Sequence, residues 1–402
     1  MKYVLSGRVF DGIELYENKS VRIDDSTGRI DSVSSPTKSS NKRDYDSQRT
    51  LEIKDGTILP GLIDTHVHFF GAKGSGINEW ATTPDSLAVL RSVSALRALL
   101  EAGFTTVREL GTKSATMLAK AADEGHFPSP RIISCSRALA QTGGDDDPPT
   151  FEIEIGQALA SYTYFCDGPW ECRRAVRKIV RDGGKCVKLY ASGGFAQGGK
   201  VRLQFTSEEI RSIVDEAHRA GLKVAAHAYG EEALLNAIEG GVDTIEHGLG
   251  LTEKTARLIN DRGIFYIPTL VTYQKIKSSP SNPAREKMVA RHFKEDMELV
   301  KKYSLKITMG SDIVGDETRP HGRNYEEIVQ EASFVGNNEA LIASTSRAAE
   351  CLDLPDVGKI MEGYVADIVI VRGNPVKDIE ALAPENILYV FKSGRLVYRA
   401  GK

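Results

Sequence analysis

The chain reads TSEEIRSIVDEAHRAG at residues 206–221, LKVAAHA at residues 222–228 and VDTIEHG at residues 242–248. Thr206 and Glu209 have the spacing of a capping box, which predicts that a helix begins here. The two later stretches are short and apolar, as expected of buried strands. Alternation of helices with buried strands is typical of a parallel sheet. One face of the predicted helix is apolar, through Ile210, Ile213, Val214 and Ala217.

The same alternation extends in both directions from this segment. Eight strands that alternate with helices over about 260 residues predict a (β/α)8 barrel. A doubly wound open sheet is the structural alternative, although it requires no particular number of strands. The eight strand-like runs are residues 58–69, 104–110, 131–137, 185–191, 222–228, 242–248, 264–270 and 305–312.

Both ends of the chain have a different pattern, in which apolar and polar residues alternate around glycine turns. The polar stretch at residues 34–50 is expected to be an exposed loop. The simplest arrangement joins the two ends in one small β-domain beside the barrel. The predicted ranges are residues 1–56 and 356–402 for the β-domain and residues 57–355 for the barrel.

Composition excludes several classes of protein. The chain has 402 residues, and 52 Lys and Arg against 55 Asp and Glu give a net charge of −3. This near balance gives no reason to expect binding to nucleic acid or to an anionic membrane. No signal peptide and no apolar run of about 18 residues is recognisable, so a cytoplasmic location is expected. Five cysteines without a CxxC pair argue against a disulfide scaffold and against a thiolate zinc site.

Histidines and a carboxylate occur at the ends of several predicted strands. His66 and His68 are two apart on the first strand, so both point to the same face. Such a pair is also compatible with structural or surface histidines. His227, His247 and Asp312 end the fifth, sixth and eighth runs, where barrel enzymes carry their catalytic residues. Imidazole and carboxylate are good ligands for Zn²⁺ or a similar divalent ion.

Lys188 lies among apolar residues in the fourth predicted strand. A buried lysine is costly unless it is paired or neutralised. One interpretation is an ion pair within the barrel. The other is a lysine carboxylated by CO₂, whose two oxygens could bridge two cations.

A set of motifs now points to a family. The motifs LPGLIDTHVHFFG, CVKLYASGG, HAYG, TIEHG and GSD, with EGYVADIVIVRGNPVKDI near the end, resemble the metal-dependent amidohydrolase superfamily. The resemblance implies a distorted (β/α)8 TIM barrel with a small β-sandwich domain formed by both termini. Within the superfamily the sequence is most similar to the prolidase-like and imidazolonepropionase-related branch, which includes Xaa-Pro dipeptidases and Arg/Lys carboxypeptidases.

The resemblance also implies a set of metal ligands and a reaction. The implied ligands are His66, His68, Lys188, His227, His247 and Asp312. His66, His68 and Asp312 would bind the more buried ion, His227 and His247 would bind the second, and carboxylated Lys188 would bridge two ions, with zinc as the expected metal. Tyr229 matches a position that contacts the substrate carboxylate in this branch.

The expected activity is hydrolysis of an amide C–N bond in a small molecule or short peptide, such as an N-acyl amino acid or dipeptide. A hydroxide that bridges the metals would attack, with Asp312 as general base and then general acid. Alternatives are hydrolysis of a lactone, ester or xenobiotic amide in the same site. Deaminases of the superfamily often carry Glu three residues after the strand-five histidine, where this chain has Gly230. A metal-free relative without activity is a further alternative, and relatives are commonly homo-oligomers.

Two loops leave questions open. Relatives often read TGGHGD after strand three, whereas this chain reads QTGGDDDPP at residues 141–149, with Asp145 in place of the histidine. The acidic residues could face a cationic substrate group or form a solvated loop, and the residue that polarises the carbonyl is left unassigned. In the loop after the eighth run, His321 and Arg323 are candidates for substrate binding, although both could serve loop structure alone.

Overall fold

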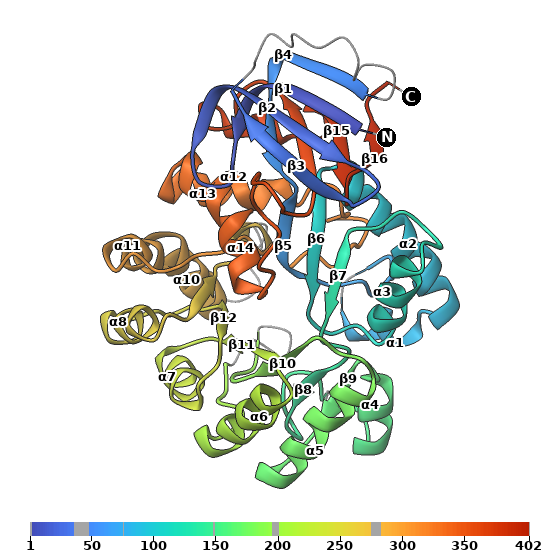
Figure 1. The fold of residues 1–402 in the computed structure, drawn as a ribbon. Coiled ribbons are helices and arrows are strands. Elements are labelled where there is room, and N and C mark those ends of the chain that lie inside the picture. Colours follow the sequence, from blue (N-terminus) through green and yellow to red (C-terminus); the bar gives the residue numbers. More distant parts are fainter. Residues whose placement is uncertain are drawn as a thin grey trace.

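The computed structural model describes residues 2–35, 48–74, 76–147, 149–194, 201–274 and 283–401. Figure 1 shows a sheet made by the first and last parts of the chain, drawn in blue and red. Beside this sheet lies a second region in which helices surround a group of strands. The predicted loop at residues 34–50 lies mostly outside the described residues, and its last three residues begin a strand.

Strands from both ends of the chain form one seven-stranded sheet in the order β16-β15-β14-β4-β1-β2-β3. β1 is antiparallel to β2 and parallel to β4, and β4 pairs antiparallel with β14. β4 continues to Pro60, past the predicted boundary at residue 56, and leads directly into the barrel. The exact domain boundaries therefore stay a prediction. The strands are β1 (Lys2–Phe10), β2 (Leu15–Asp24), β3 (Arg29–Ser34), β4 (Gln48–Pro60), β14 (Ile368–Arg372), β15 (Ile387–Lys392) and β16 (Arg395–Arg399).

The barrel strands are parallel and form a three-stranded sheet, β5-β6-β7, and a six-stranded sheet, β13-β12-β11-β10-β8-β9. Every residue of β5 and β6 is buried, as expected of strands covered on both faces. These strands are β5 (Leu62–Val67), β6 (Phe104–Glu109), β7 (Arg131–Ser134), β8 (Ala138–Ala140), β9 (Thr163–Phe165), β10 (Cys186–Tyr190), β11 (Lys223–Ala228), β12 (Thr244–His247) and β13 (Phe265–Ile267).

The eighth predicted strand lies between β13 and β5 but makes isolated bridges instead of a ladder. Ile307 bridges to Tyr266 of β13, and Ile313 bridges to Val67 of β5. The segment therefore connects the two sheets at the eighth position. The predicted distorted (β/α)8 barrel with a β-rich terminal domain is confirmed.

Helices lie outside the barrel strands (Figure 1). The expected start of α6 is confirmed, because both hydrogen bonds of the Thr206–Glu209 capping box are present. No helix among the described residues is long and apolar enough to cross a membrane. The helices are α1 (Ile77–Thr82), α2 (Asp85–Glu101), α3 (Ala115–Asp123), α4 (Ile153–Leu159), α5 (Gly168–Arg181), α6 (Ser207–Arg219), α7 (Glu231–Gly240), α8 (Glu253–Asp261), α9 (Leu270–Gln274), α10 (Pro283–Arg291), α11 (Met297–Lys302), α12 (Tyr325–Val335), α13 (Asn337–Ala343) and α14 (Ser346–Cys351).

Candidate metal centre

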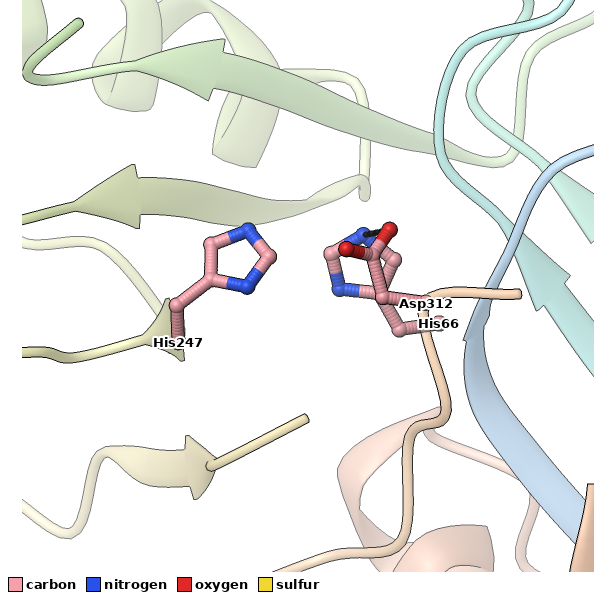
Figure 2. A group of neighbouring side chains, drawn as sticks. All are labelled: His66, His247 and Asp312. Carbon is pink, nitrogen blue, oxygen red and sulfur yellow. Dashed lines mark ion pairs between the residues drawn. The ribbon is translucent and has the colours of Figure 1, made fainter. Parts of the chain in front are cut away.

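The six predicted metal ligands come together in one cavity of about 1090 Å³ at the C-terminal end of the barrel. The four histidines and Lys188 are buried, with between 0% and 8% of each residue exposed. Figure 2 shows His66 and His247 facing one another across a short gap, with the Asp312 carboxylate beside His66. Because these residues come from β5, β12 and the segment after β13, the closure of the barrel is what brings them together.

The predicted ligand atoms lie close enough to one another to bind a common cation. The Oδ1 atom of Asp312 lies 3.3 Å from Nε2 of His66 and 3.3 Å from Nε2 of His68. One ligand atom each of His66, His247 and Asp312 lies within 4.8 Å of the others. The rings of His227 and His247 have centroids 4.7 Å apart. The two predicted sets of ligands are therefore neighbours in one continuous group.

Some of the non-glycine residues with a positive φ angle lie at the ends of the strand positions that carry the site. His247, Thr269 and Asp312 have φ angles of 67°, 51° and 53°, in the left-handed region that non-glycine residues rarely adopt. Such a conformation costs about 1–3 kcal/mol and tends to occur at functional sites. Two of these residues are in direct contact, because Thr269 Oγ1 lies 2.8 Å from Nδ1 of His247.

The donor set fits divalent cations. Nδ1 of His66 lies 2.7 Å from Glu246 Oε2, and Nδ1 of His247 is held by Thr269, so the Nε2 atom of each ring is the one left for a ligand. Among the described residues, the buried Nε2 atoms of His66 and His227 have no hydrogen-bond partner. Metal-ligating histidines commonly use one nitrogen for an orienting partner and the other for the metal. The unpaired nitrogens and the adjacent carboxylate therefore form a possible metal-binding group.

The electrostatics keep the imidazoles of His66, His227 and His247 neutral, as metal ligation requires. Burial, with a contribution from the charge of Lys188, lowers the pKa of His66 to about 4, and the pKa of His227 falls to about 3 for the same reasons. Burial raises the pKa of Asp312, but the surrounding histidines outweigh it and hold the pKa well below its usual range. At neutral pH the rings of His66 and His227 are therefore neutral, and the carboxylate of Asp312 is ionised.

A buried ion pair between Glu246 and Arg108 contacts the Nδ1 side of the His66 ring. Arg108 Nη2 donates to Oε1 of Glu246 at 2.7 Å, and Arg108 Nε donates to the carbonyl of Thr65 at 2.6 Å. Burial raises the pKa of Glu246, but Arg108 and His66 outweigh this effect and hold the pKa at about 2. Glu246 is thus an ionised acceptor that fixes the tautomer and the orientation of His66.

Lys188 is buried in β10 without an ion pair among the described residues. Its Nζ atom lies 5.6 Å from the centre of the Tyr190 ring. Burial lowers the pKa of Lys188, although the charges of Glu246 and Asp312 oppose the shift. The ion pair that was one interpretation of this residue is therefore absent from the described part of the chain.

Not all of the predicted substrate-binding residues line the cavity. Tyr229 lines the cavity, its hydroxyl lies 2.5 Å from that of Tyr273, and its ring lies against His227 with centroids 4.3 Å apart. Asp145 also lines the cavity and accepts a hydrogen bond from the backbone N–H of Gly194 at 2.7 Å.

The structure does not bring His321 and Arg323 to the cavity lining. His321 is buried, with Nε2 2.9 Å from the carbonyl oxygen of His68. Arg323 lies on the surface and forms an ion pair with Glu326 at 2.6 Å. The arginine of this loop that reaches the cavity is Arg319, whose Nη1 donates to Thr272 Oγ1 at 2.7 Å.

Sequence reasoning missed several residues of the site. Glu246 could have been found, because a charged residue next to His247 in an apolar strand requires a buried partner. The basic partner, Arg108, lies in β6 and has no local signal that indicates it. Further cavity residues that were not predicted are Phe70, Trp80, Tyr162, Arg285 and Arg319.

Comparison with known proteins agrees with this geometry. Residues 57–397 match the family model described as Amidohydrolase family. The chain belongs to the amidohydrolase family and is a hydrolase.

Individual relatives are prolidases and an ochratoxinase. Ochratoxinase of Aspergillus niger is 31% identical over 366 residues, which cover 84% of this chain and 75% of that protein. The structure of a prolidase complexed with N-methylphosphonate-L-proline is 33% identical, has a TM-score of 0.88 and covers 99% of this chain and 100% of that chain. A Xaa-Pro dipeptidase with bound methionine in its active site is 28% identical, with a TM-score of 0.85 and full coverage of both chains.

Proposed function

We propose that this amidohydrolase is a binuclear metal-dependent enzyme that cleaves the amide C–N bond of an N-acyl amino acid or a dipeptide. The observation that carries the proposal is the convergence of four imidazoles, a carboxylate and a buried lysine on one cavity. Relatives whose names include prolidase and Xaa-Pro dipeptidase support the choice of an amide substrate.

In this proposal His66, His68 and Asp312 hold one divalent ion, and His227 and His247 hold the second. Lys188, carboxylated by CO₂, would supply further oxygen ligands for these ions, and zinc is the expected metal. Its burial without an ion pair among the described residues supports this role. When bound, divalent ions lower the pKa of water towards about 7 and polarise the substrate carbonyl.

The chain's own residues move the proton and hold the substrate. Asp312 is ionised, so it accepts the proton of the attacking water and then delivers it to the leaving amine. Burial raises the pKa of Tyr229, so its hydroxyl stays protonated and can donate to a substrate carboxylate. Arg285 and Arg319 line the same cavity and supply positive charge for that carboxylate. The products are a carboxylic acid and an amino acid.

The position of Glu231 argues against deamination. Gly230, at the place where deaminases often have glutamate, precedes α7. Glu231 is exposed and accepts a hydrogen bond from Thr252 Oγ1 at 3.0 Å. The glutamate is thus engaged on the surface beside α8, and it is absent from the cavity lining.

A substrate screen tests the proposal. The zinc-loaded chain is incubated with N-acyl amino acids, dipeptides, lactones, amidines and aminopurines, and released amine and ammonia are measured separately. We expect release of free amino acids from the N-acyl amino acids or dipeptides. Ammonia from an amidine or aminopurine alone, or hydrolysis of lactones alone, would contradict the proposed amide cleavage.

A further inference from the structure

Two tyrosine hydroxyl groups meet in the wall of the cavity. Tyr229 directly follows β11, Tyr273 lies in α9, and both residues line the cavity. Both residues are buried, and their hydroxyl oxygens lie 2.5 Å apart. At this distance one hydroxyl donates a hydrogen bond and the other accepts it. The direction of this bond therefore determines which of the two tyrosines has a proton left to donate to a substrate.

The contacts of Tyr273 determine this direction. Among the described residues, the hydroxyl of Tyr273 forms hydrogen bonds only with Tyr229 and Thr269. The hydroxyl oxygen of Thr269 lies 2.8 Å from Nδ1 of His247. When Nε2 of His247 binds a metal ion, the ring proton is on Nδ1 and is donated to Thr269. Thr269 then directs its own proton to Tyr273. Tyr273 in turn donates to Tyr229, because a buried hydroxyl that makes no hydrogen bond with its proton is costly.

Packing holds Tyr273 in the position that this bond requires. The backbone N–H groups of Leu270 and Val271, in the first turn of α9, donate to the carboxyl oxygens of Glu327 at 2.7 Å and 2.6 Å. The start of α9 is thereby fixed to α12. The ring of His292 also meets the Tyr273 ring edge-on, with centroids 5.7 Å apart. Because Tyr273 is only 1% exposed, the position of its hydroxyl oxygen is set by these neighbours.

We propose, on the basis of the hydrolase function above, that Tyr273 is a positioning residue that fixes Tyr229 as a hydrogen-bond donor to the substrate. The hydrogen bonds run in one direction, from His247 through Thr269 and Tyr273 to Tyr229. Tyr229 accepts from Tyr273 and turns its own proton towards a substrate oxygen. In the opposite direction Tyr229 would present lone pairs to a substrate carboxylate, and the two groups would repel each other. A predicted metal ligand and a substrate-binding hydroxyl are thus connected through two intervening side chains.

A double-mutant cycle tests whether Tyr273 acts through Tyr229. The probe is N-methylphosphonate-L-proline, the ligand of the prolidase structure described above, and calorimetry measures its dissociation constant with the zinc-loaded chain. Tyr273→Phe should weaken binding by about fivefold, and it should have no further effect in a Tyr229→Phe chain. For a substrate, the same loss should appear in KM and leave kcat nearly unchanged. Tyr325→Phe is the control, because this buried tyrosine of α12 lies outside the cavity lining. Equal losses from Tyr273→Phe in both backgrounds would contradict the proposal.

Carbon NMR tests the direction of the hydrogen bond without a ligand. In a zinc-loaded chain with ¹³Cζ-labelled tyrosine, the Tyr229 signal is the one that Tyr229→Phe removes. Donation by a phenol moves its Cζ signal towards the phenolate position, and acceptance moves the signal away. We therefore expect Tyr273→Phe to move the Tyr229 signal towards the phenolate position, and Thr269→Val to move it the same way by less. A move in the opposite direction, or none, would refute the positioning role. The expected move in a chain that hydrolyses no amide would refute only the hydrolase function.

Discussion

The orientation of His66 depends on a chain of buried charges. Glu246 contacts His66 on one side and Arg108 on the other, and both acidic and basic groups are fully buried. Removing one charge of such a pair leaves the other without compensation, which costs about 3–5 kcal/mol. The pair therefore couples the stability of the barrel interior to the geometry of one predicted ligand.

Replacement of Glu246 by glutamine tests this coupling. Gln keeps the shape of the side chain but removes the charge that fixes the His66 tautomer and neutralises Arg108. We expect Glu246→Gln to weaken zinc binding by about 10–100-fold. Competition with a chelator measures the affinity, and Glu253→Gln, at an exposed ion pair with Lys302, is the control. Equal zinc affinity in both variants would show that Glu246 does not position the ligand.

At the scale of single elements, the segment after the eighth strand position decides which arginine lines the cavity. Asp316 accepts hydrogen bonds from the backbone N–H groups of Thr318 and Arg319 at 2.8 Å each, so the loop turns at this point. Arg319 then reaches Thr272 in α9, whereas Arg323 remains on the surface. The turn depends on side-chain hydrogen bonds, which hydrophobic patterning does not reveal.

The two arginines of this loop make a matched comparison. Because Arg319 lines the cavity, Arg319→Ala should raise the KM for substrates with a free carboxylate, by about tenfold or more, with little change for the corresponding amides. Arg323→Ala should have no such effect, because its partner is Glu326. Steady-state kinetics of both variants check the prediction. A KM effect confined to Arg323→Ala would restore the sequence-based assignment.

The residues at the C-terminal ends of the barrel strands could be predicted from the sequence, whereas the other residues that line the cavity could not. The positions of His227 and His247 follow from local alternation, because parallel strands of a closed barrel bring their C-terminal ends together. The contact of Trp80 with Tyr162 joins two connections that are distant in sequence, and no periodic pattern relates them. The same is true of Arg108 and Glu246, which meet only when the barrel closes.

At the scale of the whole molecule, the barrel contains buried carboxyl groups besides that of the candidate metal centre. Asp64 accepts hydrogen bonds from Ser311 Oγ and Asn324 Nδ2, and Glu327 accepts from the backbone N–H groups of Leu270 and Val271. Burial raises the pKa of Asp64 to about 6 and that of Glu327 to about 8. The folded state therefore favours the protonated carboxyl groups more than the unfolded chain does.

This difference predicts how stability depends on pH at Glu327. Its folded pKa of about 8 exceeds the ordinary value of 4.5, so its stabilising contribution is complete below pH 4.5 and is lost as pH rises through 8. The side chain of the Glu327→Gln variant cannot ionise. Its free energy of unfolding, relative to that of the native chain, should therefore increase by on the order of 1 kcal/mol for each pH unit between pH 4.5 and pH 8.

Urea unfolding between pH 5.5 and pH 7.5 measures this difference in free energy. Glu326→Gln, on the adjacent position of α12, controls for changes in the helix itself. If the difference between Glu327→Gln and the native chain stays constant across this range, Glu327 is not held in its protonated form by burial.

The number of metal ions held by the chain tests the central claim most directly. After loading with zinc and bicarbonate and exhaustive dialysis, elemental analysis gives the zinc content per chain. The proposed centre predicts two zinc ions per native chain, since a bridging carboxylate suits a pair of ions about 3.5–4 Å apart. It also predicts loss of zinc from Lys188→Ala. A native chain that retains no zinc, or a Lys188→Ala chain with the same zinc content as the native one, would contradict it.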